Sequence, residues 1–96
     1  MNIEITSRHF TLSERLKLLV NEKISKVNKF NIELTRCHVI LSRGNGSEES
    51  VEIVAHSKGH VFVAHDNSSV FEKSLANSVA KLSIQLKKQH DKIVAH

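Results

Sequence analysis

The stretch "TRCHVILSRGNGSEESVEIVAHSKGHVFVAHD", residues 35–66, predicts three consecutive β-strands. Apolar and polar side chains alternate over residues 35–42, 50–56 and 60–66, which is typical of strands with one buried face. The segments "RGNGSEE" and "SKG" separate the three runs and contain glycine, which favours turns. The middle of the chain is therefore expected to form an antiparallel meander.

The short "SKG" segment predicts how the last two strands pair. A three-residue hairpin loop with Gly59 in the left-handed conformation places His56 opposite His60. The register then puts these residues on the core face: Cys37, Val39, Leu41, Val51, Ile53, Ala55, Val61 and Val63. The reverse face carries a mixture that is compatible with water: Arg36, His38, Ile40, Glu52, Val54, His56, His60 and Phe62.

A strand and a helix are predicted before the meander. In "NIEIT", residues 2–6, Ile3 and Ile5 alternate with polar residues, as in a strand with one open face. In "TLSE", Thr11 and Glu14 have the spacing of a capping box, which begins a helix of roughly residues 11–29. One apolar stripe follows at helical spacing: Leu12, Leu16, Leu19, Val20, Ile24 and Val27.

A second helix is predicted after the meander. Ser69 and Glu72 in "SVFE" repeat the capping-box spacing. At about 100° per residue, a narrow apolar stripe is expected to pack on the sheet: Phe71, Leu75, Val79, Leu82, Leu86 and Ile93. The far side of the same helix carries Lys73, Lys81, Lys88 and, among these lysines, the apolar Ile84.

The order strand, helix, three strands, helix predicts an α+β protein with βαβββα topology. We expect a four-stranded sheet with two helices packed on one face, similar to a double-stranded RNA-binding domain. An RNA-recognition motif would place its second helix before the last strand and aromatic residues on its sheet. The chain has no Tyr and no Trp, so this alternative is disfavoured.

Length and charge limit the classes of function. A chain of 96 residues is expected to form one domain, residues 1–96. Lys and Arg number 14 against 10 Asp and Glu, which leaves a net charge of +4 and favours an anionic partner. A single cysteine excludes an internal disulfide, and the start of the chain has no long apolar run, so a cytoplasmic protein without a membrane partner is expected.

Three segments carry a resemblance to a known family. The segments "ITSRHFTLSERLKLLVNEKISKVNKF", "CHVILS" and "KLSIQLKKQHDK" follow one another at the spacing of that family. The pattern is a short strand, a capped helix that ends in spaced lysines, a meander, and a helix that finishes in Gln-Leu and basic residues. Over essentially its whole length the chain resembles the ribosome hibernation promoting factor and ribosome-associated inhibitor Y family, in its short form.

The resemblance implies a non-enzymatic stress or stationary-phase protein without a cofactor or small-molecule substrate. Family members bind the small ribosomal subunit in the channel of messenger and transfer RNA, contact its ribosomal RNA and block translation. Ribosome dimers would then require a separate small modulation factor, since the chain stops shortly after the second helix. The RNA-binding positions that match the family are Lys23, Lys26, Lys29, Arg36, His38, Lys87 and Lys88.

Two positions depart from the family pattern. Ile84 stands immediately before Gln85-Leu86, where many members have Arg, so one phosphate contact is missing or replaced. Ala76 stands near the position of a carboxylate that often follows an aromatic residue, whose role Phe71 would fill. These departures affect local contacts.

Other interpretations remain open at this stage. Lysines near helix C-termini interact favourably with the helix dipole and stay solvated whether or not RNA is present. A generic double-stranded RNA-binding module has the same strand and helix order. An enzyme that uses His56, His60 or His65 with Asp66 is disfavoured because no nucleophile or phosphate-loop motif is present. A metal held by His38, His56 and His60 is also disfavoured, and Cys37 is expected in the core.

Overall fold

The structure, a computed structural model, describes residues 1–27, 32–44 and 46–94. Six elements follow one another along the chain in the predicted order βαβββα. Their bounds are β1 Asn2–Arg8, α1 Glu14–Ser25, β2 Leu34–Arg43, β3 Glu49–Ser57, β4 His60–Ser68 and α2 Phe71–Val94. The α+β fold class predicted from the sequence is confirmed.

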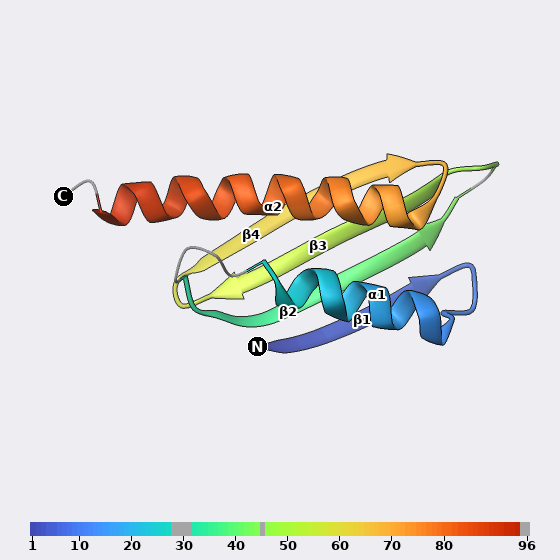
Figure 1. Cartoon of the computed structure of the whole chain (residues 1–96), viewed down its shortest axis with the longest axis horizontal. Coiled ribbons are helices and arrows are strands. Elements are labelled where there is room, and N and C mark those ends of the chain that lie inside the picture. The colour runs from blue at the N-terminus through green and yellow to red at the C-terminus, as the bar shows by residue number, and fades with distance from the viewer. Residues whose placement is uncertain (28–31, 45, 95–96) are drawn as a thin grey trace.

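The four strands form one mixed sheet in the order β1-β2-β3-β4. The first two strands are parallel, and α1 makes the crossover between them, whereas the other neighbours are antiparallel. Both helices cover the same face of the sheet and run in the same direction, so their C-terminal ends lie toward the same end of the sheet (Figure 1). No helix of the described residues covers the other face of the sheet, and we call it the open face.

A single hydrophobic core lies between the sheet and the two helices. The strands contribute residues at alternate positions, as the sequence pattern predicts. The helices contribute Val20 and Ile24 of α1 and Leu75, Leu82 and Leu86 of α2, all at most 1% exposed. Burial of these stripes fixes which side of each helix faces outward.

The predicted face of β4 is wrong by one residue. Ser57 pairs with His60 and His56 pairs with Val61, so the hairpin loop contains only Lys58 and Gly59. Gly59 does have a positive φ of 78°, as expected for its turn. The shorter loop places Phe62 in the core, where it is 2% exposed. Val61 and Val63 are left on the open face, where they are 51% and 48% exposed. A slip of one residue exchanges the two faces of a strand.

The N-terminal cap of α1 is also displaced from the predicted residue. The helix begins at Glu14, and Ser13 is its N-cap because the Leu16 amide donates a hydrogen bond of 3.1 Å to Ser13 Oγ. The described helix ends at Ser25, and the residues 28–29 at the predicted end of this helix lie outside the described residues.

The start of α2 is held by a residue distant in sequence. The amide of Phe71 donates a 2.9 Å hydrogen bond to Glu49 Oε1 of β3, instead of the local capping box predicted at Ser69 and Glu72. Arg43 Nε and Nη2 donate to Glu49 Oε2 at 3.1 and 2.8 Å. The guanidinium of Arg43 lies 5.4 Å from the ring centre of Phe10, which stacks on Phe71. We call these four residues the Arg43–Glu49 junction.

The far end of α2 extends past the sheet (Figure 1). Ile93, which the sequence pattern places in the apolar stripe, is therefore 60% exposed. Within the described residues, neither helix has an apolar segment of the length needed to span a membrane.

Candidate nucleic-acid interface

The lysines of α1 lie on the side of the helix that faces α2. Leu19 and Glu22 of α1 line one hollow together with Glu72 in the first turn of α2. Lys23 and Lys26 follow these two residues by four positions, which is one helical turn and therefore the same side. Both lysines are thus directed along the groove between the helices.

Lys26 and Lys23 differ in their surroundings. Lys26 Nζ lies 3.3 Å from Glu22 Oε1, and both side chains are more than half exposed. Exposed pairs of this kind contribute little, so Lys26 can exchange its partner at small cost. Lys23 is half-buried and makes no ion pair with the described residues. Lys29 lies outside the described residues.

Lys87 and Lys88 of α2 point in different directions although they are neighbours. Successive residues of a helix are about 100° apart. Around the helix axis, Lys88 lies within about 20° of Lys81. The ammonium of Lys81 contacts β4, so Lys88 is also on the β4 side of the helix. Lys87 lies within about 60° of Glu72, which borders the groove toward α1. Lys23 and Lys26 of α1 and Lys87 of α2 are therefore on the sides of the two helices that are turned toward each other, and we call these three residues the interhelical lysine surface.

Lys81 is held within the protein. Its ammonium donates to the backbone carbonyl of His65 at 2.8 Å and to Asp66 Oδ1 at 3.1 Å. Asn77 Nδ2 donates to Asp66 Oδ2 at 3.0 Å, and these hydrogen bonds hold the pKa of Asp66 below its ordinary value. Gln85 Nε2 donates to the carbonyl of Val63 at 2.6 Å. Side chains of α2 thus satisfy carbonyls on β4, which is an edge strand.

Arg36 and His38 lie on the open face, away from the helices. Arg36 Nη2 is 3.4 Å from Nε2 of His56, its cross-strand partner. Thr6 Oγ1 is 2.7 Å from His38 Nε2. The described candidates therefore fall into three groups: the three lysines of the interhelical lysine surface, Lys88 on the β4 side, and two residues on the open face.

The structure adds Arg8 as a basic residue of the open face that the sequence analysis missed. Strand β1 extends to Arg8, two residues beyond the predicted end at Thr6. Arg8 pairs with Ser42 and continues the alternation of Glu4 and Thr6. The alternation of "NIEITSR" was the signal that could have located it, since residues 2, 4, 6 and 8 share one face.

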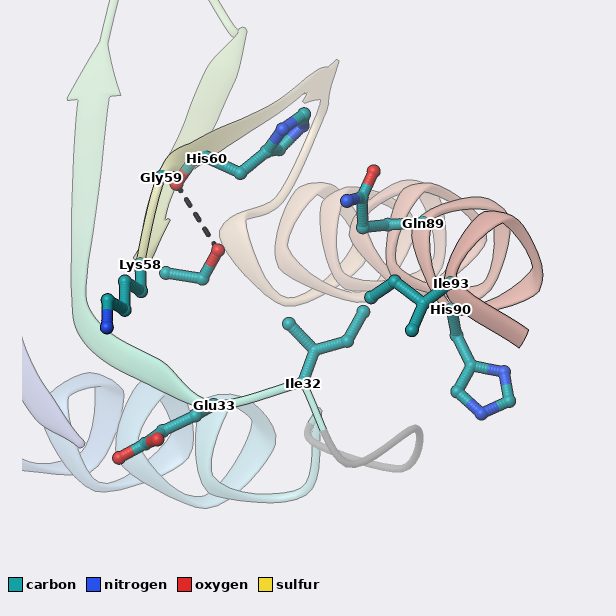
Figure 2. Close-up of a pocket in the computed structure, with 9 residues that line it drawn as sticks. Ile32, Glu33, Lys58, Gly59, His60, Gln89, His90 and Ile93 are labelled. Atoms are coloured by element: carbon teal, nitrogen blue, oxygen red, sulfur yellow. Dashed lines mark hydrogen bonds between the residues drawn. The ribbon is translucent and has the colours of Figure 1, made fainter. Parts of the chain in front are cut away.

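A separate hollow of about 410 Å³ lies beneath the overhanging end of α2 (Figure 2). Ile32 and Ile93 approach each other on one side, and His60 and Gln89 on the other (Figure 2). Ser57 Oγ donates to the His60 carbonyl at 3.4 Å. Glu33 and Lys58 also line the hollow, so its lining combines apolar side chains with one charge of each sign and differs from a lysine-rich surface.

The histidines and the cysteine are spread over different faces. His56 lies on the open face, whereas His60 points toward the helix side, so the two cannot share a metal ion. No group of three metal-ligating side chains occurs among the described residues. Cys37 is fully buried, and this burial raises the pKa of its thiol to about 11. Its predicted place in the core is confirmed.

Comparisons with known proteins identify one family. The family model described as sigma 54 modulation protein / S30EA ribosomal protein matches residues 3–94. A search of curated proteins found no match to this sequence.

Two solved structures show the same fold. A ribosomal subunit interface protein from Coxiella burnetii is 22% identical, with a TM-score of 0.86 over 93% of this chain and 97% of that chain. The N-terminal domain of Protein Y from Thermus thermophilus is 21% identical, with a TM-score of 0.84 over 93% of this chain and 99% of that chain. Because the family model covers nearly the whole chain, the chain belongs to the sigma 54 modulation protein / S30EA ribosomal protein family, that of hibernation promoting factor and protein Y.

Proposed function

We propose that this chain is a ribosome hibernation factor that binds the small ribosomal subunit through its ribosomal RNA. Its family consists of non-enzymatic proteins that modulate ribosomes. One of its structural relatives is described as a ribosomal subunit interface protein. In the proposed complex, residues 1–96 act as one ribosome-binding domain in the channel of messenger and transfer RNA, block translation and stabilise idle ribosomes.

The interhelical lysine surface is the observation that carries the proposal. This surface has three lysines on two helices, and two of them, Lys23 and Lys87, make no ion pair with the described residues. Phosphate contacts of this kind position a protein on RNA without reading its sequence. The scarcity of aromatic residues, four Phe and no Tyr or Trp, agrees with contacts to backbone rather than to stacked bases.

Lys29, Lys88, Arg36 and His38 complete the proposed contact set. Lys88 would contact RNA beside the β4 edge, and Arg36 and His38 would do so from the open face. A protein that sits in a channel is surrounded by RNA, so basic residues on more than one side are consistent with this location. The protein would act in the cytoplasm, under stress or in stationary phase, and would support ribosome dimers only together with a small modulation factor.

The first experiment measures binding of the purified chain to small subunits as salt is raised. With about five to seven phosphate contacts and a slope of roughly 0.7 to 0.9 per contact, a fourfold increase in salt should weaken binding by about two to four orders of magnitude. An affinity that does not change with salt would contradict the electrostatic mechanism.

Competition separates this function from that of a generic double-stranded RNA-binding module, which the fold also permits. A hibernation factor should stay on small subunits in the presence of excess long RNA duplex and should travel with ribosomal particles on a gradient. Equal competition by the duplex would favour the generic module.

A further inference from the structure

A polar hollow lies on the open face at the end of the sheet near the start of α2. Its volume is about 230 Å³, and all four strands contribute to it. Arg8, Ser42 and Ser50 form one row across β1, β2 and β3, and Ile40, Glu52 and His65 form the next row across β2, β3 and β4. We call these six residues the sheet-face pocket.

The charged groups of the sheet-face pocket are not used inside the protein. Among the residues that the structure describes, neither the Arg8 guanidinium nor the Glu52 carboxylate has an ion pair or a side-chain hydrogen bond. In contrast, Glu49 and Asp66 are each held by a cation within 3.1 Å. Arg8 and Glu52 are therefore available to a ligand.

The pattern of donors and acceptors limits what the pocket can bind. Arg8 offers a guanidinium that matches the oxygens of a phosphate, and Ser42 and Ser50 offer hydroxyl donors beside it. Glu52 only accepts hydrogen bonds when ionised, so it repels a bare anion and needs a hydroxyl or amide donor. A ligand with a phosphate and a neighbouring hydroxyl satisfies both ends of the pocket.

We propose that the sheet-face pocket binds the sugar–phosphate backbone of RNA, with Arg8 on a phosphate and Glu52 accepting a hydrogen bond from a ribose 2′-hydroxyl. The 2′-hydroxyl distinguishes RNA from DNA, which gives Glu52 a specific role. The pocket opens on the face opposite the interhelical lysine surface, so the protein can hold two RNA segments at once. This inference rests on the proposed function, because a channel in ribosomal RNA presents RNA to both faces.

The first test compares Arg8→Ala with Lys17→Ala in binding to small subunits at several salt concentrations. Both variants lose one positive charge, but Lys17 is exposed on α1 about 160° around the helix axis from Leu19, which lines the hollow toward α2. Arg8→Ala should weaken binding about tenfold and lower the salt slope by about 1, whereas Lys17→Ala should change the affinity much less. Arg8→Lys should recover part of the affinity, since it keeps the charge but loses the planar fork.

Equal effects of Arg8→Ala and Lys17→Ala would overturn the inference. If the wild-type chain itself failed to bind small subunits, the proposed function would fail as well, and this result is distinct from a failure of the pocket. A thermal melt followed by circular dichroism confirms that each variant is folded.

The second test uses single-stranded oligonucleotides of one sequence, as RNA and as DNA. The wild type should prefer RNA, and RNA should shift the amide resonances of Ser42 and Ser50. Glu52→Ala should bind the two oligonucleotides with equal affinity, because it lacks the acceptor for the 2′-hydroxyl. An RNA preference that survives in Glu52→Ala, or RNA binding without shifts at the two serines, would refute the assignment.

Discussion

The two ends of the helical layer use their charges in opposite ways. At the start of α2, Arg43 and Glu49 bind each other, and Glu49 also accepts a hydrogen bond from the amide of Phe71. Toward the C-terminal end of α2, Lys87 and Lys88 are exposed and make no ion pair with the described residues. Charges that are satisfied internally hold the fold, whereas charges left to solvent are available to a partner. Substitutions at the start of α2 should therefore change the stability of the protein, whereas substitutions at the other end should change its binding to a partner.

Reversal of charge on both helices should have the largest effect. In Lys26→Glu/Lys87→Glu, each substitution removes an attractive contact with phosphate and adds a repulsive one, so binding to small subunits should fall by about 100-fold or more. The melting temperature should change little because both side chains are exposed. Filter binding and a circular dichroism melt measure the two properties.

The matched control for this variant is Lys17→Glu/Lys73→Glu. It makes the same change in net charge at exposed positions in the N-terminal halves of the same helices. Its binding should remain much closer to that of the wild type. Similar losses in both double variants would show that net charge, rather than the interhelical lysine surface, determines affinity.

Glu49→Ala should have the next largest effect, and on stability. The variant loses the cap on the Phe71 amide and the charged hydrogen bonds from Arg43, which together correspond to about 2 to 3 kcal/mol in the free energy of unfolding. Urea denaturation measures this loss. Glu48→Ala, at the exposed neighbouring position, should cost little. An equally stable Glu49→Ala would mean that the Arg43–Glu49 junction does not hold the start of α2.

The single variants Lys87→Glu and Lys88→Glu sharpen the comparison within the lysine-rich end. Lys87 lies on the groove side of α2 and Lys88 on the β4 side, so Lys87→Glu should weaken subunit binding several-fold more. Parallel titrations under one salt condition measure the difference. The reverse order would place the main RNA contact beside β4 instead of in the groove.

Ile84→Arg should have a smaller effect, and a favourable one. Ile84 is 56% exposed and lies on the outer surface of α2 between the directions of Lys87 and Lys88. An arginine there supplies one more cation, so binding should tighten about threefold and become more sensitive to salt. Weaker binding with an intact fold would indicate that Ile84 itself makes an apolar contact with the partner.

Asp66→Asn should produce the smallest change in stability, present at pH 6 and lost in acid. The pKa of Asp66 is lowered by hydrogen bonds from Asn77 and Lys81, so its contribution to stability is present above its ordinary value of 3.8 and is lost as pH falls through the lower folded value. Urea midpoints of wild type and Asp66→Asn at pH 6 and pH 2.5 measure this. The wild type should lose more stability than the variant over that interval, and equal losses would contradict the assignment.

Short-range patterns in the sequence predicted most of the elements. The alternation of apolar and polar side chains located the strands, because successive side chains of a strand point to opposite faces. The apolar stripes located both helices, because a helix that packs on a sheet buries one continuous side. The seven candidate RNA contacts came from the family resemblance, and the structure separates those that it describes onto different sides of the molecule. Their role in binding stays a prediction. Arg8 was missed because the strand was ended two residues early.

The sequence by itself determined the order of elements, the fold class and the excess of positive charge, because each depends on composition or on neighbours within one turn or one strand. Only the tertiary structure decided which face of "HVFVAHD" is buried. Apolar side chains occur on both faces of this strand, and a one-residue change in loop length exchanges the two faces. It also decided which charges are free: Glu49 and Lys81 are satisfied by residues far away in sequence, and Arg8 and Glu52 are brought together by strand pairing. Long-range pairing is set by the packing of the whole sheet, which no local pattern records.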